Sequence, residues 1–383
     1  MKINKLFRFL MILALGLLFV NCTSDPVQGP PGQDGIDGID GVDGADGADG
    51  TASCVSCHSN ATREPIAEAF FGVSGHGSNF ISFAARRASD TTDVLTNNAC
   101  AQCHSQEGFI DFVETGTTVI GGYPNAKPWD CATCHSSHRT FDFENDGPDY
   151  ALRNPDPTQL VLAPSITLDF GDSSNNCISC HQPRNSYEFP ALNPDGTYQV
   201  VSTRFGPHYG PQSTMLEGVL GAEIAGSEAY PARASATHRT ESSCVNCHMG
   251  ESSDPEIGGH SWKFVEATCI ECHGAVPGEA NGFSADMETL LALLNAVEGQ
   301  AVELDGEGDP IFDETGNLIP TGGTVTGIIL PNGRSQYGIF SDVAAMAAWN
   351  YKSAEQDHSR GIHNPGYTKA LLKNSIEALQ NEN

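Results

Sequence analysis

The chain has 383 residues, of which 17% are charged and thirteen are cysteines, a length that allows one large domain or two smaller ones. Its net charge of −29 and its pI near 4.5 exclude a nucleic-acid-binding protein, which needs a basic face. The same charge favours small cations, mineral surfaces or basic docking patches as partners, although an acidic surface also keeps an exported protein soluble.

The N-terminus has the pattern of an export signal. Basic residues precede an apolar run over 9–20, which is too short and wrongly flanked for a spanning helix. The run leads into Cys22 through a stretch that resembles a bacterial lipobox, except that Asn21 replaces the usual small residue. We predict a lipoprotein signal peptide at 1–21 and lipidation of Cys22, with ordinary secretion and a leftover thiol as the alternative.

Residues 22–50 read as a lipid-anchored acidic stalk. From Gly29 to Gly50 a glycine recurs at every third position, as in collagen, where only glycine fits at the axis of the triple helix. Proline nearly disappears after Pro31, and the aspartates of the repeat would repel one another across chains. We therefore expect a flexible stalk, with a short trimerising collagen segment as the alternative.

Residues 51–280 contain a five-residue motif six times. Each copy reads Cys-x-x-Cys-His, the attachment pattern of c-type haem: the thiols form thioethers to one porphyrin edge, and the histidine becomes the proximal iron ligand. The sequence predicts a hexahaem domain with six covalently bound haem c. The predicted attachment cysteines are Cys54, Cys57, Cys100, Cys103, Cys131, Cys134, Cys177, Cys180, Cys244, Cys247, Cys269 and Cys272, and the predicted proximal histidines are His58, His104, His135, His181, His248 and His273.

Three alternative roles of paired cysteines account for less of the pattern. Zinc ribbons do not require a histidine after every second cysteine. A disulfide framework would suit an exported protein but explains neither the fixed gap nor the histidines. A thioredoxin-like redox pair would occur once.

The fold class predicted is mainly α with much irregular structure, haems forming the core and a long C-terminal helix. Uneven spacing of the motifs argues against a tandem repeat, and dense glycine and proline predict short helices. Residues 281–383 read as a helical C-terminal region with a hairpin insert at 302–338. The individual elements predicted are helices at 65–71, 285–301, 342–351 and 367–379 and short strands at 159–162, 165–168 and 198–201.

Seven histidines lie outside the motifs, enough to close the sixth coordination position of every iron with one to spare. Methionine could serve instead at Met215, Met287 or Met346 but is not needed. The three tryptophans, at 129, 262 and 349, are predicted to pack rather than relay electrons. The seven histidines are His76, His138, His208, His238, His260, His358 and His363.

Several stretches resemble the multihaem cytochromes related to ammonia-forming cytochrome c nitrite reductase and hydroxylamine oxidoreductase. The similar stretches are Ser-Gly-His-Gly at 74–77, Cys-Ala-Thr-Cys-His-Ser-Ser-His at 131–138, Gly-Pro-His-Tyr-Gly-Pro-Gln at 206–212, His238 shortly before the fifth motif, Cys-His-Met at 247–249, Gly-Gly-His at 258–260 and Gly-Ile-His-Asn-Pro at 361–365. The resemblance implies a mostly α fold with closely packed haems. It also implies the distal ligands His76, His138, His208, His238, His260 and His363, which leaves His358 as the spare.

The chain departs from this family where catalysis would occur. It has no Cys-x-x-Cys-Lys motif, whose lysine leaves an open iron in the nitrite reductases, and Ser227 stands near the position of their catalytic histidine. Hydroxylamine oxidoreductases carry more haems, one of them crosslinked to tyrosine. The resemblance therefore supports the scaffold more than the catalysis.

The predicted function is an electron carrier with six bis-histidine haems, rather than an enzyme. The alternative is a reductase of nitrite, hydroxylamine or a sulfur oxyanion at one five-coordinate haem, with Arg184, Arg204 and Tyr209 lining an anion site. A haem filament with histidines donated between subunits is a third hypothesis. The predicted location is the outer membrane or cell surface, with the periplasm as the alternative. Predicted partners are other redox proteins of the cell envelope, a membrane through the lipid anchor, and a second copy of the chain through the stalk or C-terminal helix.

Overall fold

The computed structural model describes residues 63–79, 98–119, 123, 126–147, 149–184, 189–280 and 282–382. The signal peptide, Cys22, the stalk and the first motif, Cys54 to His58, lie outside these described residues. The chain divides into two units, Met1–Asp49 and Gly50–Asn383, and all described residues belong to the second.

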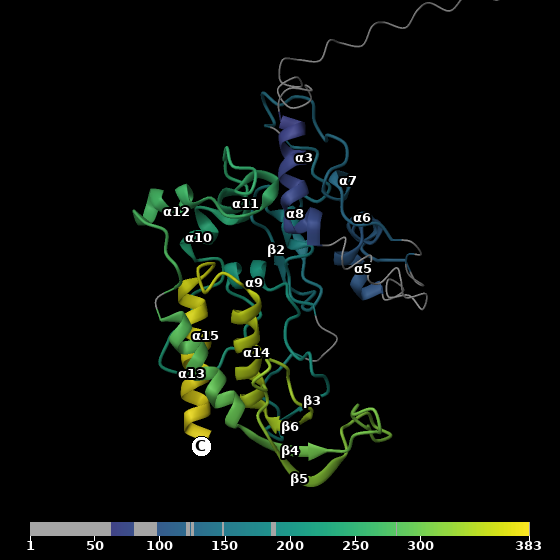
Figure 1. Cartoon of the computed structure of the whole chain (residues 1–383), viewed down its shortest axis with the longest axis vertical. Coiled ribbons are helices and arrows are strands. Elements are labelled where there is room, and N and C mark those ends of the chain that lie inside the picture. The colour runs from purple at the N-terminus through teal and green to yellow at the C-terminus, as the bar shows by residue number, and fades with distance from the viewer. Residues whose placement is uncertain are drawn as a thin grey trace, which may run out of the picture. The chain divides into compact units, whose positions relative to one another are not determined.

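Residues 51–280, which contain the six motifs, are called the haem region. Its described part consists of short helices joined by long irregular segments (Figure 1). Its longest helix is α3 (Arg63–Val73), which confirms the helix predicted at 65–71 and leads into the π-helix η2 (Gly75–Asn79). The predicted strands 159–162 and 165–168 shrink to one antiparallel pair, β1 (Thr158–Gln159) with β2 (Thr167–Leu168). The other helices are α5 (Asn98–His104), α6 (Gln106–Thr115), α7 (Cys131–Cys134), α8 (Asn175–Ile178), α9 (Gln212–Glu217), α10 (Thr237–Thr240), α11 (Ser243–His248), η3 (Gly259–Ser261) and α12 (Glu266–His273).

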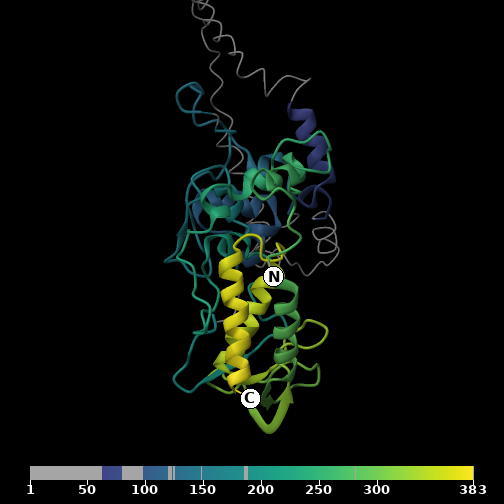
Figure 2. The ribbon, with the colours of Figure 1, turned by 90° about the vertical axis from the view of Figure 1, so that its left-hand side faces the viewer.

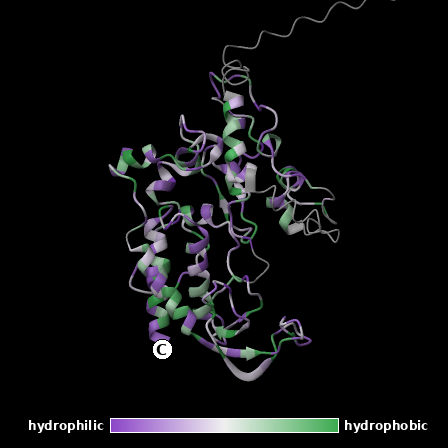
Figure 3. Ribbon diagram, in the orientation of Figure 1, coloured by the Kyte–Doolittle hydropathy of each residue, from purple (hydrophilic) through white to green (hydrophobic). Residues whose placement is uncertain are grey.

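The C-terminal region contains three longer helices, α13 (Phe283–Ala296), α14 (Asp342–Gln356) and α15 (Pro365–Glu382), which lie side by side (Figures 1 and 2). Helix α14 begins at an N-cap serine, Ser341, whose hydroxyl accepts from the Ala344 N–H. Helix α15 begins at Pro365, where proline is tolerated because the first-turn N–H has no helical acceptor. Figure 3 shows hydrophobic and hydrophilic residues next to one another along these helices.

An antiparallel sheet packs beside these helices in the strand order β3-β6-β4-β5. Its first strand, β3 (Thr197–Val200), comes from the haem region and pairs with β6 (Gly338–Ser341). The hairpin of β4 (Glu298–Val302) and β5 (Pro320–Thr326) completes the sheet. A segment between two haem motifs is thereby tied to the C-terminal region.

The largest apolar core lies between this sheet and the three helices. Trp349 is its central side chain: it is fully buried, its ring contacts Phe189 and Phe205, and its Nε1–H donates to the Leu220 carbonyl at 2.9 Å. Trp349 is therefore a packing residue, as predicted.

The helix predicted at 285–301 is wrong at its C-terminal end. Helix α13 ends at Ala296, and the next residue, Val297, has extended backbone. Its carbonyl accepts from the Gly327 N–H at 2.7 Å, so the chain leaves the helix to pair with the hairpin. The apolar period continued past this point because Val297, the first residue after the helix, is itself buried in the core. Among the described residues, no helix combines the length and apolarity that crossing a membrane requires.

Candidate functional site

Each of the five described Cys-x-x-Cys-His motifs lies on or next to a short helical turn. The third motif shows why the chain turns there: Asp130 caps α7 by accepting from the Ala132 N–H, and the Thr133 hydroxyl accepts from the Asp130 N–H. A single turn of this kind brings two thiols three residues apart to the same side of the backbone.

Every motif histidine of the described residues faces one histidine from outside the motifs. In each pair the two rings come from distant parts of the chain, and the ring separations are nearly equal. The centroid distances are 6.3 Å for His104–His208, 6.0 Å for His135–His260, 6.1 Å for His181–His76, 6.3 Å for His248–His363 and 5.9 Å for His273–His238.

This spacing is the one that two imidazoles on opposite faces of a metal ion require. A metal–imidazole bond is about 2 Å long, and the ring centroid lies about 1 Å behind the ligating nitrogen, so two such rings have centroids about 6 Å apart. Rings in direct aromatic contact have centroids anywhere between about 4.5 and 7 Å, but five pairs within 0.4 Å of one another indicate a common geometric requirement.

Hydrogen bonds at Nδ1 orient most of these histidines. Because the partner is an oxygen that can only accept, the proton is on Nδ1 and the lone pair is on Nε2, the arrangement typical of metal-ligating histidines. The acceptors are the Tyr150 carbonyl for His135 at 2.8 Å, the Gln212 amide oxygen for His181 at 3.2 Å, the Ile362 carbonyl for His238 at 2.6 Å, the Trp262 carbonyl for His248 at 2.8 Å, and the carboxylates of Asp149 for His138 at 2.5 Å and Asp357 for His363 at 2.7 Å.

Burial keeps several of these imidazoles neutral, the form that binds iron. Desolvation, with a smaller contribution from the facing histidine, lowers the pKa of His76 and of His260 to about 4. Burial likewise lowers the pKa of His181 and His248. His363 differs: burial lowers its pKa, but the Asp357 carboxylate more than offsets this and leaves the pKa raised.

Cysteines of different motifs also meet. Cys103 of the second motif interacts through its thiol with Cys180 of the fourth, and Cys177 of the fourth interacts with Cys244 of the fifth. Cys247 of the fifth motif is near enough to raise the pKa of Cys269 in the sixth, although burial raises it more. The second, fourth, fifth and sixth motifs therefore follow one another in space.

The zinc and disulfide roles of the cysteines find no support in the described residues. The ten motif cysteines there are free thiols without disulfides, and no group of three or more histidine, cysteine, aspartate or glutamate side chains converges as a metal-ion site. By contrast, two thiols on one turn and two facing imidazoles are the donor set of a bis-histidine haem c.

The last two predicted histidines have other described neighbours. His138 contacts Phe141 and Phe143 and donates from Nδ1 to Asp149, and His58, the histidine of the first motif, lies outside the described residues. His358 is exposed, in a left-handed backbone conformation with φ of 58°. The alternative ligands Met215 and Met346 are buried in apolar clusters.

The residues predicted to line an anion site in a reductase, Arg184, Arg204 and Tyr209, lie around His208 of the His104–His208 pair. The pKa of His208 is lowered first by burial and then by the charges of Arg184 and Arg204, and its ring contacts Tyr209. His208 itself faces His104, so the residues of the predicted anion site adjoin a pair of facing imidazoles.

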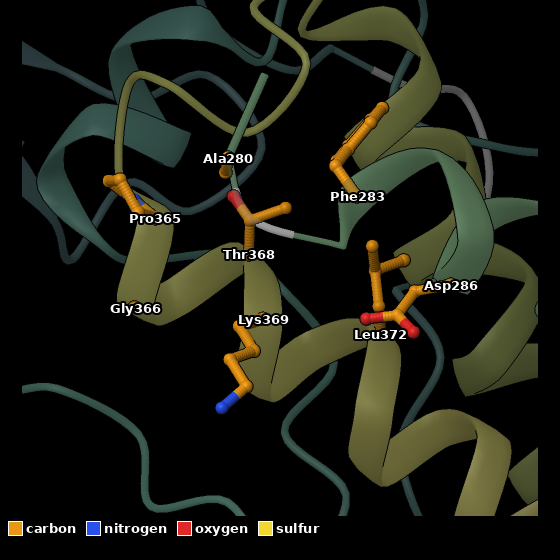
Figure 4. A pocket seen from close by; sticks show the side chains of 8 residues that line it. All are labelled: Ala280, Phe283, Asp286, Pro365, Gly366, Thr368, Lys369 and Leu372. Carbon is orange, nitrogen blue, oxygen red and sulfur yellow. The ribbon is translucent and has the colours of Figure 1, made fainter. Parts of the chain in front are cut away.

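Two cavities lie away from the histidine pairs. One of about 200 Å³ lies between α13 and the start of α15; Figure 4 shows its apolar wall with Asp286 and Lys369 at the edge. The other, of about 480 Å³, is lined by aspartates, prolines and neighbouring residues of 149–175. Neither has a histidine or cysteine in its lining, and the lining of the second includes Asp149, which accepts from Nδ1 of His138.

Sequence reasoning missed the acceptors that orient the ligands. Asp149, Asp357 and Gln212 have no fixed spacing from the histidines they bond. For the two aspartates, the sequence offered one signal: Asp149 lies eleven positions from His138, and Asp357 lies six positions from His363. Trp262 was correctly predicted to pack, but it packs on ligand candidates: its ring contacts those of His76 at 4.4 Å and His260 at 5.3 Å.

Comparisons with known proteins give a sequence match and a weaker structural likeness, and no family model matches the chain. The C-type polyhaem cytochrome OmcC of Geobacter sulfurreducens is 25% identical over 344 residues, which are 75% of this chain and 43% of OmcC. The crystal structure of the outer cell wall cytochrome OcwA matches with a TM-score of 0.44 and 19% identity, covering 81% of this chain and 50% of that one. The chain thus spans about half the length of these relatives or less.

The repeated motifs and the sequence match define the class: the chain is a multihaem c-type cytochrome. Within that class it is related to OmcC, and it has a more distant structural likeness to OcwA.

Proposed function

We propose that the chain is an electron carrier whose irons each have histidine on both faces. The observation that carries this proposal is the set of five histidine pairs with ring centroids 5.9–6.3 Å apart. Haem iron, when bound, exchanges one electron between Fe(III) and Fe(II). With both axial positions filled by side chains, there is no position for a substrate, which favours transfer over catalysis.

The sixth site is proposed to join His138 and His58. His138 belongs to the predicted distal set, and His58 is the predicted proximal histidine of the first motif. The Asp149 carboxylate orients the His138 ring through Nδ1 and leaves Nε2 for iron. This assignment gives six haems and leaves His358 as the spare histidine.

The contacts between motifs support a continuous path. Thiols of the second and fourth, the fourth and fifth, and the fifth and sixth motifs lie close together, so porphyrins attached there would have neighbouring edges. The chain's own residues would hold these edges next to one another.

The cell envelope is the proposed location. An export signal and a lipobox-like stretch ending at Cys22 support a lipoprotein of the outer membrane or cell surface, passing electrons to other redox proteins. Cys22→Ser is expected to release the cytochrome from the membrane fraction without changing its haem content. Continued membrane association of this variant would contradict the anchor.

The spin state of the oxidised protein tests the ligand set. Electron paramagnetic resonance of the wild type is expected to show only low-spin iron, and His260→Ala is expected to convert one iron to high spin. The matched control is His358→Ala, which should leave every iron low-spin. A high-spin iron in the wild type that binds nitrite or cyanide would favour the reductase instead.

A further inference from the structure

We propose that Asp357 lowers the reduction potential of one iron, that of the fifth motif, below the potentials of its neighbours. The inference rests on the proposed ligation of that iron by His248 and His363. It assigns a role to a buried carboxylate that the electron-carrier function alone does not require.

The geometry fixes Asp357 against the distal ligand. Its Oδ1 accepts from Nδ1 of His363 at 2.7 Å, and only 1% of the Asp357 side chain is exposed. The Ser359 hydroxyl donates to the other carboxylate oxygen and accepts from the His363 N–H at 3.2 Å. Asp357 caps the end of α14, where its own N–H donates to the Ser353 carbonyl, so its position is set by the helix.

Neutral acceptors bind Nδ1 of one histidine in three of the other described pairs, and Nδ1 of His248 in the same pair as His363. The Nδ1 atoms of His135, His238 and His248 donate to backbone carbonyls, and that of His181 donates to an amide oxygen. The second carboxylate partner, Asp149 at His138, is more accessible, with 16% of its side chain exposed. Compared with the pairs of the third, fourth and sixth motifs, the pair of the fifth motif is thus distinguished by a buried negative charge at Nδ1 of a ligand.

This charge favours the oxidised iron for two reasons. A carboxylate draws the Nδ1 proton toward itself, which makes Nε2 a stronger electron donor to the metal. Its field, weakly screened because it is buried, also opposes the electron that converts Fe(III) to Fe(II). No bond forms or breaks in this step. Because the fifth motif lies between the fourth and the sixth, an electron crossing it passes through an unfavourable intermediate.

The test is a redox titration of the holoprotein with Asp357→Asn. Asparagine keeps the shape and an acceptor oxygen but removes the charge, so the affinity of one iron for an electron should rise about tenfold, which is about 59 mV for a one-electron couple. The matched control is Asp342→Asn, which removes another buried charge, at the start of α14, whose Oδ2 accepts from the Asn193 N–H. It should leave every potential unchanged.

A second variant predicts the opposite sign. Ser359→Ala removes a donor from the Asp357 carboxylate, so the same iron should become harder to reduce. The inference is overturned if neither variant shifts a potential beyond the control, or if Asp357→Asn shifts all potentials equally. Should Asp357→Asn fail to incorporate haem, two other variants still test the inference. These are Ser359→Ala and Asp357→Glu, the second of which keeps the charge.

Failure of the inference differs from failure of the proposed function. If His363→Ala creates one high-spin iron while Asp357→Asn shifts no potential, His363 is a ligand and only the role of Asp357 is wrong. If His363→Ala leaves every iron low-spin, the proposed ligand set itself is wrong.

Discussion

The haem region and the C-terminal region are stabilised in different ways. In the C-terminal region three helices and a sheet bury a continuous apolar core around Trp349. The described part of the haem region has a smaller apolar cluster around Leu168 and Ile178, short helices, and an interior rich in thiols and imidazoles. A region built in this way depends on its cofactors and on polar contacts, because it has little apolar surface to bury.

Glu217 at the end of α9 shows how the polar contacts work. Its side chain is 3% exposed, and its two oxygens accept from Arg233 and Arg239, each at 2.7 Å. The same arginines donate to the carbonyls of Thr167 and Asp169 next to β2. The Glu217 carboxylate therefore links α9 to β2 and to the segment around α10. In the C-terminal region, apolar side chains such as leucine and phenylalanine make the corresponding contacts.

The largest effect expected is on haem-free protein. Alanine at all motif cysteines should abolish protection from hydrogen exchange over 98–184 and 237–273, whereas β3, α13, α14 and α15 should keep protected amides because their core contains no haem ligand. Mass spectrometry of exchanged peptides measures this. Equal loss of protection in both regions would show that the comparison is wrong.

Trp349→Ala should destabilise the C-terminal region by about 3–5 kcal/mol, since it removes a fully buried side chain and leaves a cavity. Urea unfolding followed by far-ultraviolet circular dichroism gives the free energy, and the low-spin haem absorption should persist until unfolding. Phe264→Ala, at a half-exposed position, is the control and should change stability by less than about 0.5 kcal/mol.

Glu217→Gln should destabilise the haem region by about 1–3 kcal/mol, because it replaces a buried acceptor of two charged donors with a neutral amide. Hydrogen exchange at α9 and α10 reports the loss. The control is Glu256→Gln, whose partner Lys263 lies 3.4 Å away on an exposed surface. An equal response in both variants would contradict the role given to burial.

Arg139→Ala should have the smallest effect, about 0.2–1 kcal/mol, because its bidentate pair with Asp156 is exposed on both sides. The hydrogen bond from Arg139 lowers the pKa of Asp156. The pair therefore contributes above the unfolded pKa of about 3.9 and loses its contribution as the pH falls through the folded value. Stability of variant and wild type should converge in acid; a constant difference across this pH range would exclude the ion pair as the cause.

The sequence alone predicted what depends on short spacing. Five residues suffice to specify thiols and a proximal imidazole on one turn, so the motifs, the class of protein and the pool of distal histidines followed from local pattern. Helices α14 and α15 were also predicted, because their apolar period and the Asn364-Pro365 break are local. The end of α13 was not, because the pairing of β4 with β5 and β6 overrides a period that continues past Ala296.

Only the tertiary structure decided which histidines face each other. His104 meets His208 and His248 meets His363 across more than a hundred residues of chain, and no local spacing encodes such a pairing. The same is true of β3 joining β6, and of Asp357 reaching the His363 ring. These contacts arise when separate segments pack together, because side chains that share no periodicity can still meet in the folded chain.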